Sequence, residues 1–188
     1  MLGPFQTWAL QAKFHLAFES DSRIDRMSER IWDVYLSGEI HTDWRQSIAE
    51  GVEAADLPVQ LHGPVCIHAD SDDCGAIILG SEDDAFWHDR KGASMNAVRT
   101  RTLLGSADVV VVRFGDRYRQ WNAAFDAGIA AASGKALITL HAPELNHALK
   151  EVDAAALAVC ETPEQVVQSL AYAIRGTLPG CRQNLAAE

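Results

Sequence analysis

Apolar residues fall in short runs along the chain, and the clearest run is Val109–Val112. Four consecutive β-branched residues favour a strand that is buried on both faces, as in the middle of a parallel sheet. Four further runs have the length of a strand and lie near glycine, proline or other turn residues. The predicted strands are Trp32–Ser37, Pro58–His62, Ala107–Phe114, Ala136–Leu140 and Ala156–Cys160.

Helices are predicted between these strands. Ile48 and Val52 lie four residues apart, which places both on one helix face. Thr162 and Gln165 have the spacing of a capping box at a helix start, and Gly134 is suited to follow a helix end. The predicted helices cover residues 44–55, 94–105, 119–133 and 163–175.

The polar segment from Cys66 to Ala93 is expected to be a long loop, with a short helix or strand near residues 76–80. Ser94 is expected to cap the helix that follows, and residues 143–151 are expected to form a loop or short helix. Strand and helix otherwise alternate about five times without a repeat or a linker. This pattern predicts an α/β fold, a doubly wound sheet of about five mostly parallel strands with helices on both faces.

The first 26 residues differ from the rest, and two interpretations stand. They are a short helix docked on the domain, or they lie upstream of a true start at Met27, which the first strand follows at once. They lack the basic region, clean apolar stretch and small-residue cleavage site of a secretory signal. The expected division is an extension over 1–26, a domain over 27–177 and a tail over 178–188.

Composition narrows the functional classes. The 188 residues contain 16 Lys and Arg against 26 Asp and Glu, a net charge of −10. Such a chain is a poor binder of nucleic-acid backbones or anionic membranes, although a few arginines can still hold one phosphate. The four cysteines are scattered without C-x-x-C spacing, which indicates reduced thiols of a cytoplasmic protein and no zinc site.

Parallel strands place a binding crevice at their carboxyl ends. The first strand ends at Gly38, followed by Glu39, His41 and Arg45. Glycine lets backbone amides approach a ligand closely, and the helix behind it favours an anion. The alternative is an ordinary strand-loop-helix turn with solvated charges.

The helix after the central strand carries Asn122 and Asp126 on one face. Asp126 is the only acid in a run of Ala, Phe, Gly and Ile. It is either a carboxylate that points into the crevice or part of the solvent-exposed polar face of an amphipathic helix. Asp108 precedes the central strand and is interpreted as a turn residue away from the crevice.

Two features of the polar segment invite other interpretations. The run from His68 to Gly75 is rich in aspartate but departs from the calcium-loop pattern, so a flexible acidic loop is favoured over a metal site. Trp87 lies among charged residues, as a lid stacking on a planar ligand or as an anchor for its own loop.

Several motifs together resemble the YtoQ family. They are WDVYLSGEIHTDWRQ, the HGP turn, NAVRTRTLLGSADVVVVRFGDRYRQWNAAFDAGIAAASGKALI and HAPELNHALKEVD, and they cover about Ile31 to Arg175 in order. This family is similar to the nucleoside 2-deoxyribosyltransferases and the deoxynucleotide N-hydrolases. The resemblance implies a flavodoxin-like fold and action on the N-glycosidic bond of a nucleoside or nucleotide, by transfer or hydrolysis.

The resemblance also implies roles for individual residues. Asp126 falls on the position of the superfamily's nucleophilic Glu, one methylene shorter, and the superfamily's second Asp has no match near Arg99–Arg101. The expected catalytic residues are Asp126, with Glu39 and Asp116 as acid or base. The expected binding residues are Tyr35, Gly38 and His41 near the sugar, Trp44, Trp87 and Trp121 stacking on the base, Arg45 and Arg99 on a phosphate, and Asn122.

No cofactor or metal is expected, and the partner is a small nucleoside or nucleotide. A homodimer or higher homo-oligomer follows from the superfamily. The alternative function is a non-catalytic nucleotide-binding or sensing protein on the same fold, because of the Asp-for-Glu change and the missing second Asp.

Overall fold

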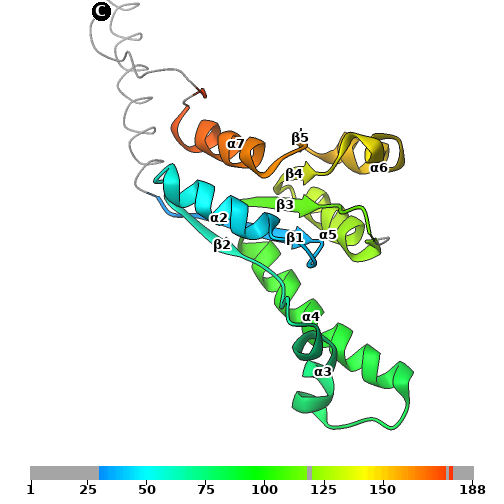
Figure 1. Cartoon of the computed structure of the whole chain (residues 1–188). Coiled ribbons are helices and arrows are strands. Elements are labelled where there is room, and N and C mark those ends of the chain that lie inside the picture. The colour runs from blue at the N-terminus through cyan, green and yellow to red at the C-terminus, as the bar shows by residue number, and fades with distance from the viewer. Residues whose placement is uncertain (1–29, 118–119, 177, 180–188) are drawn as a thin grey trace, which may run out of the picture.

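The computed structural model describes residues 30–117, 120–176 and 178–179. Its centre is a five-stranded parallel sheet in the order β2-β1-β3-β4-β5 (Figure 1). This is the strand order of a flavodoxin-like doubly wound sheet, so the predicted fold class is confirmed. The strands are β1 (Trp32–Gly38), β2 (Val59–His62), β3 (Val109–Arg113), β4 (Ala136–Leu140) and β5 (Ala158–Cys160).

Helices cover both faces of the sheet. α2 (Trp44–Ala54) and α7 (Pro163–Arg175) pack on one face, against the side of β1 that carries Val34 and Leu36. α5 (Trp121–Ala132) and the end of α4 (Ala85–Ser106) pack on the other, where Tyr35 points. Alternate strand residues thus supply two separate cores. The predicted capping box at Thr162 and Gln165 is present at the start of α7.

The segment expected to be a loop is instead helical. Residues 66–93 contain α3 (His68–Leu79) and the first part of α4, so the prediction of a long loop is wrong. Asp84 caps α4 through its carboxylate, which accepts hydrogen bonds from the amides of Phe86 and Trp87. Ser94 therefore lies inside the helix and donates to the carbonyl of Arg90.

α3 and α4 form a hairpin that projects from the body of the molecule (Figure 1). They touch where both have glycine. A Cβ on Gly75 would lie 2.1 Å from the carbonyl carbon of Lys91, and one on Gly92 would lie 2.6 Å from the carbonyl oxygen of Asp72. α3 and α4 approach each other closely at these glycines, where most helix pairs would pack through a stripe of apolar side chains. The polar pattern of this segment therefore gave no helical signal.

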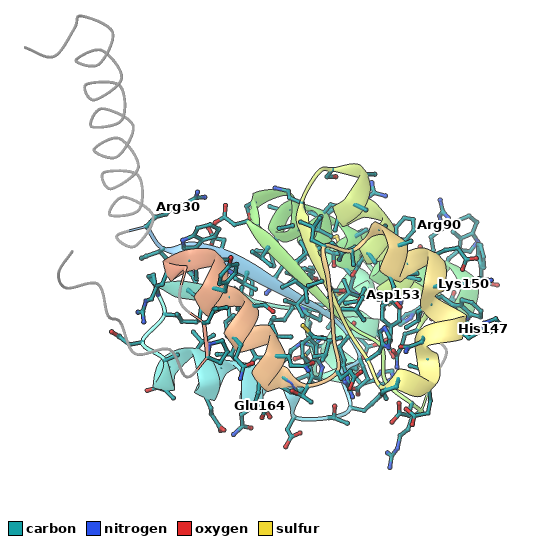
Figure 2. The ribbon with its side chains drawn as sticks, turned by 90° about the horizontal axis from the view of Figure 1, so that it is seen from above. Arg30, Arg90, His147, Lys150, Asp153 and Glu164 are labelled. Carbon is teal, nitrogen blue, oxygen red and sulfur yellow. The ribbon has the colours of Figure 1, made fainter. Side chains whose placement is uncertain are left out.

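The segment after β4 is also more helical than expected, with a 3-10 turn (Pro143–Leu145) followed by α6 (Asn146–Ala155). Asp153 joins α6 to β4, since its carboxylate accepts from the hydroxyl of Thr139 at 2.8 Å and lies 3.1 Å from Nε2 of the buried His141. Figure 2 labels Asp153 on the side of α6 toward the sheet and Lys150 and His147 at its outer side.

At the amino ends of the parallel strands, Asp108 holds β1 and β3 in register. Its carboxylate accepts a hydrogen bond from the amide of Asp33 at 3.1 Å and pairs with Arg30. The interpretation of Asp108 as a turn residue is confirmed. The expectations for residues 1–26 and for most of 178–188 lie outside the described residues. No helix in the described part of the chain has the length and apolarity needed to cross a bilayer.

Candidate active site

A cleft of about 660 Å³ opens at the carboxyl ends of the strands, between β1, the α3–α4 hairpin and α5. Its position is the one that the crevice rule for parallel sheets gives. Eight residues that the sequence singled out line it together: Tyr35, Gly38, Glu39, His41, Arg99, Trp121, Asn122 and Asp126.

Asp126 lies half-buried on α5 and faces the end of β1. The hydroxyl of Ser37, a residue that the sequence reasoning missed, donates to its carboxylate at 2.5 Å. Burial raises the pKa of Asp126, and the hydrogen bond from Ser37 offsets part of that rise. The cleft thus contains one carboxylate with a fixed orientation and a raised proton affinity, and a perturbed carboxyl group in a cleft is typical of a functional site.

Glu39 lies at the same edge and is only 5% exposed. Its carboxylate accepts hydrogen bonds from the backbone amide of His41 and from the hydroxyl of Thr42. Burial raises the pKa of Glu39, but these two hydrogen bonds and the charges of His41 and Arg113 outweigh it, so the pKa is lowered overall. Glu39 is therefore held as a carboxylate, which suits an acceptor of hydrogen bonds better than a donor of protons.

Trp44 and Arg45 hold this loop in place and do not line the cleft. Trp44 is 3% exposed, and its indole Nε1 donates to the carbonyl of Glu39 at 2.8 Å. The guanidinium of Arg45 lies 4.4 Å from the Trp44 ring centroid and donates to the carbonyls of Leu36, Gly38 and Glu39. Both side chains have their polar groups engaged by backbone, so stacking by Trp44 and phosphate binding by Arg45 are not supported by their positions.

Gly38 fits the tight junction between β1 and this loop. Its φ is +103°, and a Cβ there would lie 2.1 Å from the carbonyl oxygen of Arg113 on β3. The same carbonyl accepts a hydrogen bond from the amide of Glu39 at 3.2 Å. Only glycine therefore lets the chain turn here while β1 and β3 stay paired.

The opposite wall comes from α4. The buried Tyr35 hydroxyl lies 3.4 Å from the Thr100 hydroxyl, and desolvation by burial raises the pKa of Tyr35. Arg99 donates to the carbonyl of Gly63 at 3.2 Å. The sequence reasoning missed the other polar side chains that α4 brings to the cleft. These are Asp89, Asn96, Thr100 and Arg101.

The missed residues share one signal. Asp89, Asn96 and Thr100 recur at spacings of seven and four, which places them on one face of a helix. That signal depends on knowing that α4 begins at Ala85 rather than after Ser94.

Two further predicted residues, besides Trp44 and Arg45, stand apart from the cleft lining. Trp87, in the first turn of α4, is 53% exposed and packs edge-to-face on Phe86, with ring centroids 5.1 Å apart. Asp116 is exposed after β3. By contrast Trp121, 72% exposed at the first residue of α5, presents its indole at the cleft wall.

The aspartate-rich run after His68 is the first turns of α3 rather than a loop. His68 pairs with Asp72 at 2.7 Å along the helix. Within the described ranges, no three His, Cys, Asp or Glu side chains come together in a way that could hold a metal ion.

Comparisons with known proteins place this chain in a family. The family model described as "Nucleoside 2-deoxyribosyltransferase YtoQ" matches residues 35–174. The uncharacterized protein YtoQ of Bacillus subtilis (strain 168) is 41% identical over 139 residues, which cover 74% of this chain and 94% of that protein. A conserved protein of Enterococcus faecalis V583, with a solved crystal structure, shares the fold with a TM-score of 0.53 at 14% identity, over 75% of this chain and 98% of that chain. This chain belongs to the YtoQ family, which is nucleoside 2-deoxyribosyltransferase-like.

Proposed function

We propose that this protein cleaves the N-glycosidic bond of a nucleoside-type substrate, by transfer or hydrolysis, with the carboxylate of Asp126 as nucleophile. The observation that carries the proposal is the 2.5 Å hydrogen bond from the buried Ser37 to Asp126 in the cleft. A carboxylate aimed by a neighbour's hydroxyl is what attack at an anomeric carbon requires.

The reaction proceeds in two displacements. An Asp126 oxygen bonds to the anomeric carbon, the bond from that carbon to the base nitrogen breaks, and its electron pair leaves with the base, which takes up a proton. Water or a second base then attacks the same carbon and loses a proton. The bond to Asp126 breaks, and the free carboxylate is regenerated.

The walls of the cleft supply binding groups. Trp121 offers an aromatic face for the base at the rim, and Asn122, one helical turn before Asp126, offers an amide that can both donate and accept hydrogen bonds. Tyr35 stays protonated because burial raises its pKa, and its hydroxyl donates to that of Thr100 at 3.4 Å. His41 and Arg99 complete the polar lining on two sides.

Non-catalytic binding remains the second candidate, favoured by one observation. The α4 wall presents Arg99, Thr100 and Arg101, where the superfamily has a carboxylic acid to protonate the leaving base. A cleft without that acid binds a nucleoside but leaves the base a poor leaving group.

A product screen distinguishes the two candidates. The protein is incubated with nucleosides, deoxynucleosides and their 5′-monophosphates, with and without free acceptor bases, and free base is read by chromatography. We expect base release or exchange that is lost in Asp126→Asn and kept in Asp70→Asn, which changes an exposed aspartate outside the cleft lining. Thermal stabilisation by a nucleoside with no product over long incubation would instead support the binding function.

We also infer that two copies associate through the exposed side of α4. Apolar side chains gather on the projecting hairpin without packing on its own body: Ile77, Ile78, Leu79, Phe86, Trp87 and Val98 are each more than half exposed. Trp87, Ser94 and Val98 follow one stripe along α4, which an antiparallel pair of protomers would bury between them.

Analytical ultracentrifugation tests this association. Val98→Asp and Trp87→Asp should each dissociate the dimer, whereas a wild-type protein that stays monomeric at high concentration would contradict it.

We place the activity in the cytoplasm, because Cys66, Cys74 and Cys160 are free thiols.

A further inference from the structure

The groups that would receive a phosphate at this edge of the sheet are already occupied. Loops that lead into a helix commonly bind phosphate through backbone amides and hydroxyls. Here the amide of His41 and the hydroxyl of Thr42 both donate to the carboxylate of Glu39. The chain's own anion fills this position in the loop between β1 and α2.

Glu39 is held so that it does not move aside. Its carbonyl accepts from the indole of Trp44 at 2.8 Å and from Arg45, and its amide donates to the carbonyl of Arg113. Its side chain packs against Gly115, where a Cβ would lie 2.6 Å from Cγ of Glu39. Backbone and side chain are therefore both fixed.

Arg45 and Arg113 lie near enough to Glu39 to stabilise its charge, but neither of them lines the cleft. Its lining includes four acidic side chains, Glu39, Asp72, Asp89 and Asp126, and two arginines, Arg99 and Arg101. Of the arginines, Arg99 already donates to the carbonyl of Gly63. A phosphate ester at the sheet edge would thus lie near two fixed negative charges.

We propose that Glu39 is the specificity-determining residue that accepts a hydrogen bond from the substrate's 5′-hydroxyl and excludes its 5′-phosphate ester. The inference rests on the proposed function, because it places the anomeric carbon against Asp126. From Ser37, whose hydroxyl donates a hydrogen bond to Asp126, to Glu39 the chain advances two residues, which span at most about 7 Å. The exocyclic 5′-hydroxyl is the sugar group that reaches that far from the anomeric carbon. The substrates are therefore free nucleosides rather than nucleoside monophosphates.

The expected discrimination follows from Coulomb's law. Two unit charges about 6 Å apart at an effective dielectric constant of about 20 repel enough to weaken binding by about 100-fold. An ionised carboxylate has lone pairs beyond the two that His41 and Thr42 use, so a neutral hydroxyl still finds an acceptor.

The test compares each nucleoside with its 5′-monophosphate. In the wild type, kcat/KM should be at least about 100-fold higher for the nucleoside than for its monophosphate. The thermal shift on binding should likewise be larger for the nucleoside. Glu39→Gln, which removes the charge, and Glu39→Ser, which also frees the loop donors, should cut this preference by at least tenfold through a gain on the monophosphate. Glu53→Gln, an exposed glutamate on α2 outside the cleft lining, serves as the control and should leave the preference unchanged.

The wild-type measurement alone decides the proposal if the variants fail to fold. Base release from monophosphates as efficient as from nucleosides would overturn the role of Glu39 and leave the proposed function standing. Release from no substrate would contradict the proposed function, and the thermal shifts would still decide Glu39: equal stabilisation by nucleosides and monophosphates would overturn its role.

Discussion

Replacing Gly38 by alanine should destabilise the protein strongly. At a φ of +103° an L-residue is strained by about 1–2 kcal/mol. The new Cβ would lie 2.1 Å from the carbonyl oxygen of Arg113, and forcing atoms into such a contact costs about 1–3 kcal/mol more. Moving that carbonyl away also weakens the hydrogen bond from the Glu39 amide, worth about 0.5–1.5 kcal/mol. The sum is about 2.5–6.5 kcal/mol.

Two other glycines of the chain separate these contributions. Gly134 also has a positive φ, +68°, but a Cβ there meets nothing within 4 Å, so Gly134→Ala should cost only the strain of about 1–2 kcal/mol. Gly128 lies inside α5 in open space, and Gly128→Ala should gain up to about 1 kcal/mol of helix propensity.

Urea unfolding followed by circular dichroism measures all three free energies. For a chain of this size, 1 kcal/mol corresponds to about 2–4 °C in Tm, so Gly38→Ala should melt at least about 5 °C lower than the wild type. A Gly38→Ala protein as stable as Gly134→Ala would refute the role given to the contact with Arg113.

Three further changes follow from the same structure. Asp126→Asn should be as stable as the wild type or more stable. Because burial raises the pKa of Asp126, ionising this side chain destabilises the folded state; the cost is zero below the pKa of the unfolded state and complete above that of the folded state. The melting temperatures of the two proteins should therefore diverge as the pH rises. Gly75→Val should cost about 1–3 kcal/mol and expose the amides of α3 to hydrogen exchange before those of the sheet. His141→Ala removes one of the two partners of Asp153 and should cost about 1–3 kcal/mol in chemical denaturation.

Each of these has a contrary result. An Asp126→Asn protein that is less stable than the wild type at every pH would mean that the carboxylate stabilises the fold. Uniform loss of exchange protection in Gly75→Val would mean that the hairpin and the sheet unfold together. An unchanged denaturation midpoint in His141→Ala would mean that the contact between His141 and Asp153 does not stabilise the fold.

The centre of the sheet could be predicted from the sequence because β1, β3 and β4 are mostly buried on both faces. Val109–Val112 is apolar at every position, as a central parallel strand must be. The α3–α4 hairpin could not, because its helices meet through Gly75 and Gly92 instead of an apolar stripe. Helices that pack through glycines show no periodic pattern of apolar residues in the sequence.

The cleft was predictable only in part, for two different reasons. Trp44 shares a helix stripe with Ile48 and Val52, and that spacing already indicated a core residue rather than a base-stacking one. Arg45 carried no such signal, because its partners are backbone carbonyls whose positions depend on the conformation of the loop. Asp126 was found because its position matches a family motif and lies beyond the carboxyl end of the central strand.

The central claim is that Asp126 bonds to the sugar, and trapping that bond tests it most directly. A 2′-fluoro nucleoside destabilises the oxocarbenium-like transition state, slows both displacements and lets a glycosyl-enzyme accumulate. Mass spectrometry of the intact protein should show one added glycosyl group, peptide mapping should place it on Asp126, and Asp126→Asn should remain unmodified. Base release from the wild type without any adduct, or an adduct on another residue, would contradict the account.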